Sequence, residues 1–202
     1  MYCCRIRRCF GTGGVIVLLV LALFSCESEN SPATFYPIDS LITAQIKHLT
    51  TINAGLFKEA LLDGKTDTVT YTPGDTSSWA QELDIFRELN DINKPVNKEN
   101  YRVTDGLLDT QSNLKIKAFN CVEELPVVYL KVYYQGSIDK PRKIEALYDQ
   151  GNRLFGSTRV LSMHFQQINN TTVLTSYSVK GGQKMILADS VAFYISGKIW
   201  ID

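Results

Sequence analysis

The second half of the chain consists of short segments with strand character separated by turn residues, and this pattern constrains the fold more than any other feature. Apolar residues alternate with polar ones in several segments, for example Ile116 and Ala118 with Lys115 and Lys117. Strands are predicted over 101–108, 114–118, 127–135, 142–148, 160–167, 172–180, 183–187 and 190–199. Because the connections are short and contain no helix, successive strands are expected to pair antiparallel.

Two further strands are predicted before residue 73. An apolar run over 56–62 and a threonine-rich segment over 66–72 flank Asp63-Gly64, which is a strong signal for a two-residue hairpin turn. In the second half of the chain, Lys180-Gly181-Gly182-Gln183 predicts another hairpin turn, because two adjacent glycines commonly mark such turns.

Two helices are predicted in the first half of the chain. The first begins at Pro37 and places apolar residues on one face at spacings of three and four: Ile38, Leu41, Ile42, Ile46 and Leu49. The second follows N-cap candidates at 75–78, has the stripe Trp79, Leu83, Phe86 and Leu89, and is broken over 90–100. The expected fold is α+β, with a single curved antiparallel sheet of roughly eight or nine strands and the two helices packed on one face.

The N-terminus has the pattern of a secretory signal peptide. Arg5, Arg7 and Arg8 precede an unbroken apolar run from Val15 to Phe24, which is followed by the small residue Ser25. An uncleaved membrane anchor is the alternative interpretation, but this run is shorter than the roughly 20 apolar residues that cross a bilayer. The predicted organisation is a signal peptide over 1–25, an N-terminal tether over 26–36 and a single α+β domain over 37–202.

Leu23-Phe24-Ser25-Cys26 resembles the lipobox of bacterial lipoproteins. This resemblance implies that Cys26 is lipidated, becomes the new N-terminus and attaches the protein to a membrane of the bacterial cell envelope. The acidic residues of Glu27-Ser28-Glu29 resemble the sorting region of lipoproteins from the Bacteroidota, which implies the outer membrane, on either its periplasmic or its surface leaflet.

The charge of the exported chain argues against a nucleic-acid partner. Residues 1–25 contain three arginines and no acidic residue, so the remaining chain carries three more acidic than basic side chains. A protein that binds nucleic acid needs an excess of basic residues to neutralise the phosphate backbone.

Both faces of the predicted strand over 127–135 carry bulky side chains, which is the only feature that points to a ligand. A covering by helices or a curled sheet is one explanation. The other explanation is a concave apolar groove for a lipid or peptide. The residues predicted to line such a groove are Tyr129, Tyr133, Tyr148, Tyr177 and Phe193.

No catalytic or metal-binding motif is present in the sequence. The chain has two histidines, His48 and His164, which is too few for a multi-histidine metal site, and no cofactor is expected. Ser162 and His164 lie two residues apart on a predicted strand and therefore share a face. The alternative function is thus an envelope hydrolase that uses these two residues.

The predicted order of elements resembles that of uncharacterised envelope lipoproteins of the Bacteroidota. The resemblance rests on the early helix, the strand that turns at Asp63-Gly64-Lys65, the helix start at Ser77-Ser78-Trp79 and the late segment 180–184. The layout is also similar to that of the lipoprotein carriers LolA and LolB, in which helices cover a curved antiparallel sheet around an apolar cavity. These resemblances imply a non-catalytic lipoprotein that binds an apolar ligand or an envelope protein through its sheet.

Overall fold

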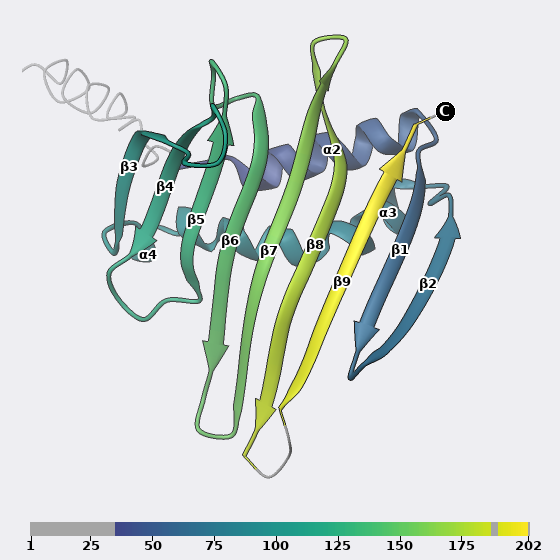
Figure 1. The fold of residues 1–202 in the computed structure, drawn as a ribbon. Coiled ribbons are helices and arrows are strands. Elements are labelled where there is room, and N and C mark those ends of the chain that lie inside the picture. Colours follow the sequence, from purple (N-terminus) through teal and green to yellow (C-terminus); the bar gives the residue numbers. More distant parts are fainter. Residues whose placement is uncertain (1–34, 187–189, 202) are drawn as a thin grey trace, which may run out of the picture. The chain divides into compact units, whose positions relative to one another are not determined.

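The computed structural model describes residues 35–186 and 190–201, and within them it shows a single nine-stranded antiparallel sheet (Figure 1). This confirms the predicted α+β fold. The spatial order is β2-β1-β9-β8-β7-β6-β5-β4-β3. The strands are β1 (Gly55–Leu62), β2 (Lys65–Tyr71), β3 (Tyr101–Leu108), β4 (Lys115–Cys121), β5 (Val127–Tyr134), β6 (Pro141–Gly151), β7 (Phe155–Ile168), β8 (Thr171–Met185) and β9 (Val191–Trp200).

The sheet combines a meander with an early hairpin. Strands β3 to β8 each pair with the next strand along the chain, as short connections favour. The β1–β2 hairpin is added beyond β9, with Leu56 opposite Ile199. The two residues of its turn, Asp63 and Gly64, have φ angles of 49° and 78°. These positive φ angles are what the Asp-Gly pair predicts.

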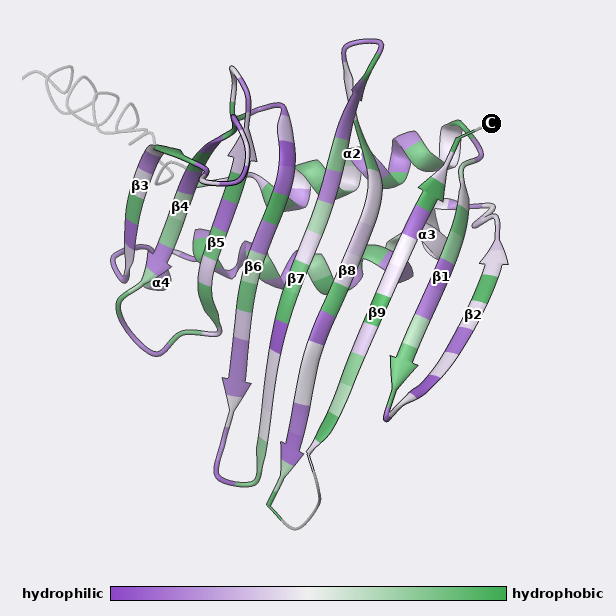
Figure 2. Cartoon of the chain, viewed as in Figure 1, coloured by the Kyte–Doolittle hydropathy of each residue, from purple (hydrophilic) through white to green (hydrophobic). Residues whose placement is uncertain are grey.

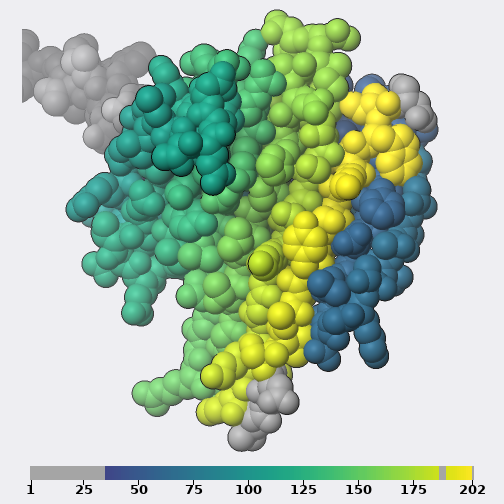
Figure 3. Space-filling model, viewed as in Figure 1, coloured from purple at the N-terminus to yellow at the C-terminus, as the bar shows by residue number. Residues whose placement is uncertain are grey.

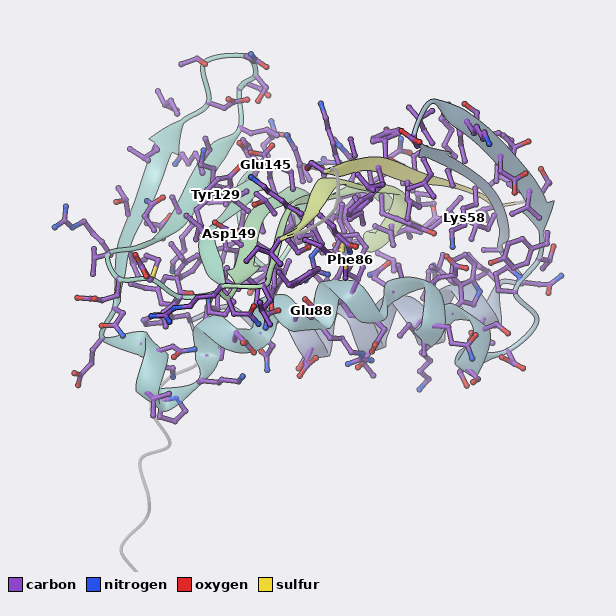
Figure 4. The ribbon with its side chains drawn as sticks, turned by 90° about the horizontal axis from the view of Figure 1, so that it is seen from below. Lys58, Phe86, Glu88, Tyr129, Glu145 and Asp149 are labelled. Carbon is purple, nitrogen blue, oxygen red and sulfur yellow. The ribbon has the colours of Figure 1, made fainter. Side chains whose placement is uncertain are left out.

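The helical segments lie on one face of the sheet, which arches over them (Figure 4). They are α2 (Ile38–Thr51), α3 (Thr76–Leu83), the 3-10 helix η2 (Asp84–Asn93) and the short α4 (Pro95–Lys98). None of the helices in the described residues has the length and apolar character needed to cross a bilayer. Residues 1–34, with the predicted signal peptide and Cys26, lie outside the described part of the chain.

Helix α2 packs on the sheet through its predicted stripe, and one polar residue fastens it to β8. Ile38, Ile42 and Leu49 are at most 1% exposed. Gln45 is also buried: its Nε2 donates to the carbonyl oxygen of Thr172 at 2.9 Å, and its Oε1 accepts from the backbone N–H of Leu174 at 2.7 Å. The side-chain amide therefore pairs two backbone groups of β8, which offsets the cost of its own burial.

The second predicted helix differs from the expectation in its C-terminal half. Asp75 caps α3 by accepting from the backbone N–H of Ser78 at 2.7 Å, but the α-helix ends at Leu83 and continues as η2. The buried residues Leu83, Phe86, Leu89 and Ile92 recur every three residues. A 3-10 helix has three residues per turn, so this spacing points all four side chains at the sheet.

The packed structure also begins earlier than the predicted boundary at residue 37. Tyr36 is 4% exposed, and the ring of Phe35 stacks on that of Phe119 with centroids 5.6 Å apart. The side chain of Asn93 holds this segment in place, because its Oδ1 accepts from the backbone N–H of Phe35 at 2.8 Å. The end of the predicted tether is therefore part of the core.

Gly181 and Gly182 lie inside the long strand β8 and do not form the predicted hairpin turn. They pair with Arg159 and Thr158 on one side and with Phe193 and Ala192 on the other. A Cβ atom on Gly181 would lie 2.5 Å from the carbonyl oxygen of Thr158 and 2.9 Å from the ring of Phe193. Glycine is therefore required here by a close approach and not by a turn.

Candidate functional site

Two of the five predicted groove residues, Tyr148 and Tyr177, belong to the core beneath the helices. They are 6% and 3% exposed. The ring of Tyr177 contacts the ring of Phe86 from η2 edge to face, with centroids 5.8 Å apart. The cavity that a groove would need at these positions is filled by helix side chains.

Tyr129 and Tyr133 lie on the opposite face of the sheet, which we call the outer face. In Figure 4, Tyr129 and Glu145 lie farther from the helices than the core residue Phe86. Cations cover the two rings: Lys131 Nζ is 4.7 Å from the ring centroid of Tyr129, and Lys143 Nζ is 5.0 Å from that of Tyr133. The surroundings of this pair are therefore charged rather than apolar.

Phe193 lies on the helix-covered face, where it is partly buried and packs against the core. It shares this face with Ile195, which pairs with the buried residue Val179. The lower ends of β1 and β7 to β9 extend past the helices (Figure 1). A groove of about 340 Å³ lies at this end, which we call the apolar groove. Its lining residues are Ala60, Leu61, Leu62, Gln183, Val191, Phe193 and Ile195.

The mouth of the apolar groove is rich in exposed apolar side chains. Leu62 is 54% exposed, Met185 58% and Ile186 63%, and Leu154 at the neighbouring hairpin is 64% exposed. Figure 2 shows hydrophobic residues at the lower ends of β1 and β9. Exposed apolar residues that gather at one end of a molecule mark a binding surface more often than single ones do.

Sequence reasoning named Phe193 but missed the other lining residues of this groove. The alternation of Val191, Phe193 and Ile195 was a usable signal for a strand with one apolar face. The interpretation of Gly181-Gly182 as a turn divided β8 into two predicted strands, so the pairing of Gly181 with Phe193 and of Gln183 with Val191 was not foreseen.

Ser162 and His164 are brought together on the outer face of β7. Ser162 Oγ lies 3.3 Å from His164 Nε2. Partial burial, followed by the positive charge of Lys143, lowers the pKa of His164, so its imidazole is neutral near pH 7. In the described part of the chain no carboxylate hydrogen-bonds to the His164 ring, and Glu145 instead accepts from Lys143 at 2.6 Å. The pair therefore has a nucleophile and a base, without the acid that orients the base in a triad.

Across 35–186 and 190–201, no three side chains of histidine, cysteine, aspartate or glutamate gather into a potential metal site.

Comparisons with protein-family models, with curated protein sequences and with solved structures find no match for this chain.

Proposed function

We propose that the protein is a non-catalytic lipoprotein of the bacterial cell envelope that binds an apolar ligand, such as a lipid acyl chain, in the apolar groove. The observation that carries this proposal is an open groove with apolar walls at the uncovered end of the sheet. The lipobox-like segment that ends at Cys26 supports attachment to the outer membrane, where acyl chains are abundant.

The size of the groove suits a single acyl chain. A volume of about 340 Å³ is at the low end for small-molecule sites, so it accommodates part of one chain and leaves a headgroup in water. Burial contributes roughly 0.8 kcal/mol for each methylene group, and about eight such groups would supply roughly 6 kcal/mol. A gain of this size corresponds to a dissociation constant of about 40 μM, and because immobilising the chain has a cost, the expected value lies between tens of micromolar and several millimolar.

A charge placed at the mouth of the groove tests this proposal. Leu62→Asp should abolish the binding of a fluorescent fatty acid, because the carboxylate would have to lose its hydration against the apolar chain. Leu107→Asp is a matched control, since Leu107 is an exposed strand leucine outside the groove (47% exposed, against 54% for Leu62). If both variants bind like the wild type, the apolar groove is not the ligand site.

A hydrolase is a second candidate function, favoured by the 3.3 Å contact between Ser162 Oγ and His164 Nε2. The two candidates differ in their response to a serine-reactive fluorophosphonate. A hydrolase would be labelled at Ser162, and the label would disappear in Ser162→Ala. We expect no labelling, because β7 is an interior strand whose backbone N–H groups near Ser162 are engaged with β6 and β8 and cannot form an oxyanion hole.

A further inference from the structure

A second cavity lies on the outer face, on the other side of the sheet from the apolar groove. It has a volume of about 640 Å³ and is enclosed by the β3–β4 loop and strands β4 to β7. We call it the outer cleft. Its floor is one row of neighbouring residues across four strands: Ile116, Tyr133, Lys143 and His164. The β3–β4 loop stands forward from the sheet as the wall of the cleft (Figure 3).

Three basic side chains converge on this cleft from two adjacent strands. They are Lys131 of β5 and Arg142 and Lys143 of β6. Consecutive residues of a regular strand point to opposite faces. The pairing of β5 with β6 shifts between Tyr133 and Tyr134, which leaves Arg142 as an extra residue. Such a bulge re-aims a side chain, and here it allows Arg142 and Lys143 to line the same cleft.

The acidic groups of the outer cleft pair with only one of these three basic side chains. Glu145 accepts from Lys143 Nζ at 2.6 Å, and Asp109 Oδ2 accepts from the hydroxyl of Ser112 at 2.6 Å. Within residues 35–186 and 190–201, neither Lys131 nor Arg142 forms an ion pair. Two positive charges therefore face the cleft without a carboxylate partner.

The floor of the outer cleft adds a neutral hydrogen-bond donor. Burial, followed by the negative charge of Glu145, raises the pKa of Tyr133 to about 12, so its phenol remains protonated at physiological pH. Partial burial, followed by the positive charge of Lys143, lowers the pKa of the neighbouring His164, while the negative charge of Glu145 acts in the opposite direction. The cleft thus offers cations and a hydroxyl donor to an anionic group.

We propose that the outer cleft binds a phosphate group, carried either by a soluble molecule or by a lipid headgroup. A phosphate monoester has a charge between about −1.5 and −2 at pH 7, which matches the two unpaired cations better than a carboxylate does. The planar guanidinium of Arg142 can donate two parallel hydrogen bonds to phosphate oxygens, while Lys131 supplies a point charge. Leu108, Leu114 and Ile116 line the cleft as well and provide apolar contact for the rest of the ligand.

Calorimetric titration of the full-length, detergent-solubilised protein with inorganic phosphate at low ionic strength tests this proposal. Arg142→Gln should weaken binding at least about tenfold, since a hydrogen bond to a charged group contributes about 1.5 kcal/mol or more. Arg153→Gln makes the same charge change at an exposed loop outside the cleft and should bind like the wild type. Lys131→Gln provides a second variant, and equal thermal melting curves would confirm that each variant folds.

Several outcomes would overturn the proposal. These are a wild-type protein that does not bind phosphate, an Arg142→Gln variant that binds as tightly as the wild type, and acetate that binds as tightly as phosphate. Two phosphate monoesters distinguish the sources: tighter binding of glucose 6-phosphate identifies a soluble ligand, and tighter binding of dihexanoyl phosphatidic acid identifies a lipid. Binding to the outer cleft must persist in Leu62→Asp, which separates this site from the apolar groove.

Discussion

Removing the charge of Glu82 should destabilise the domain, because this residue of α3 joins the helix layer to three strands. Its Oε2 accepts from Lys58 Nζ of β1 at 2.7 Å and from the hydroxyl of Tyr177 of β8 at 2.8 Å. Its Oε1 accepts from the hydroxyl of Tyr71 of β2 at 2.6 Å. Figure 4 shows Lys58 between the sheet and the helices. Glu82→Gln keeps the size of the side chain, removes its negative charge and replaces one acceptor oxygen by an NH2 donor.

The expected loss of stability in Glu82→Gln depends on how exposed Glu82 and its hydrogen-bond partners are. Breaking a buried ion pair by removing one partner typically costs about 3 to 5 kcal/mol. The side chain of Glu82 is 13% exposed, but that of Lys58 is 31% exposed and can still reach water. Tyr177 is 3% exposed and would compete for the remaining acceptor. We therefore expect the free energy of unfolding to fall by about 2 to 3 kcal/mol, which is below the range for a fully buried pair.

The effect of Glu82→Gln should depend on pH in one direction. Burial by itself would raise the pKa of Glu82, but hydrogen bonds from Lys58, Tyr71 and Tyr177 outweigh it and hold the pKa below its ordinary value. A carboxylate with a lowered pKa stabilises the fold above the pKa of the unfolded chain, about 4.3 for glutamate. This contribution is lost as the pH falls through the pKa of the folded state. The difference between wild type and variant should thus be full at pH 7 and shrink below about pH 4.

Urea unfolding of the wild type and of Glu82→Gln, at neutral and at acidic pH, measures both quantities. Glu59→Gln is the matched control, because no hydrogen bond or ion pair of the Glu59 side chain occurs among the described residues. A midpoint for Glu82→Gln that equals the wild-type value at pH 7 would refute the reasoning. A difference of the same size at acidic pH would refute the assigned role of the charge.

Three further predictions concern packing and location. Phe86→Ala should lower the free energy of unfolding by roughly 3 to 5 kcal/mol, because Phe86 is fully buried; an unchanged melting temperature would show that η2 does not pack through it. Gly181→Ala should destabilise by about 1 to 3 kcal/mol, whereas Gly182→Ala, whose new Cβ would meet nothing nearer than 3.7 Å, should be tolerated; equal urea midpoints would contradict this. Cys26→Ser should leave an unprocessed precursor that is not labelled by radioactive palmitate, and wild-type labelling would disprove the lipoprotein interpretation.

The stripes of the two helices and the turn of the first hairpin could be predicted because their signals are local. Ile38, Ile42 and Leu49 recur at the period of an α-helix, and they are buried as that period requires. Asp63-Gly64 favours positive φ angles at both turn positions, whatever the hairpin later contacts. The short connections after residue 100 were similarly sufficient to predict an antiparallel sheet.

The candidate sites could be predicted only in part, because they depend on register and on the extent of the helix layer. The pairing of Ser162 with His164 followed from the two-residue period of a strand. Tyr177 points toward the helices, whereas Tyr133 lies on the outer face. This difference follows from the pairing of the strands, which a single sequence does not reveal. The outer cleft also required the bulge at Arg142, which has no sequence signal of its own.

The sequence by itself determined most of the strands, the first helix and the antiparallel arrangement of the sheet, and its N-terminal pattern predicts export to the cell envelope. The tertiary structure decided that β1 joins β9, that the helices leave one end of the sheet open, and that Gly181 lies within a strand beneath Phe193. The physical reason is the range of the interactions. Helix periods and turn geometry act between residues close in the chain, whereas the pairing of residue 56 with residue 199 depends on what remains unpaired after the whole chain has packed.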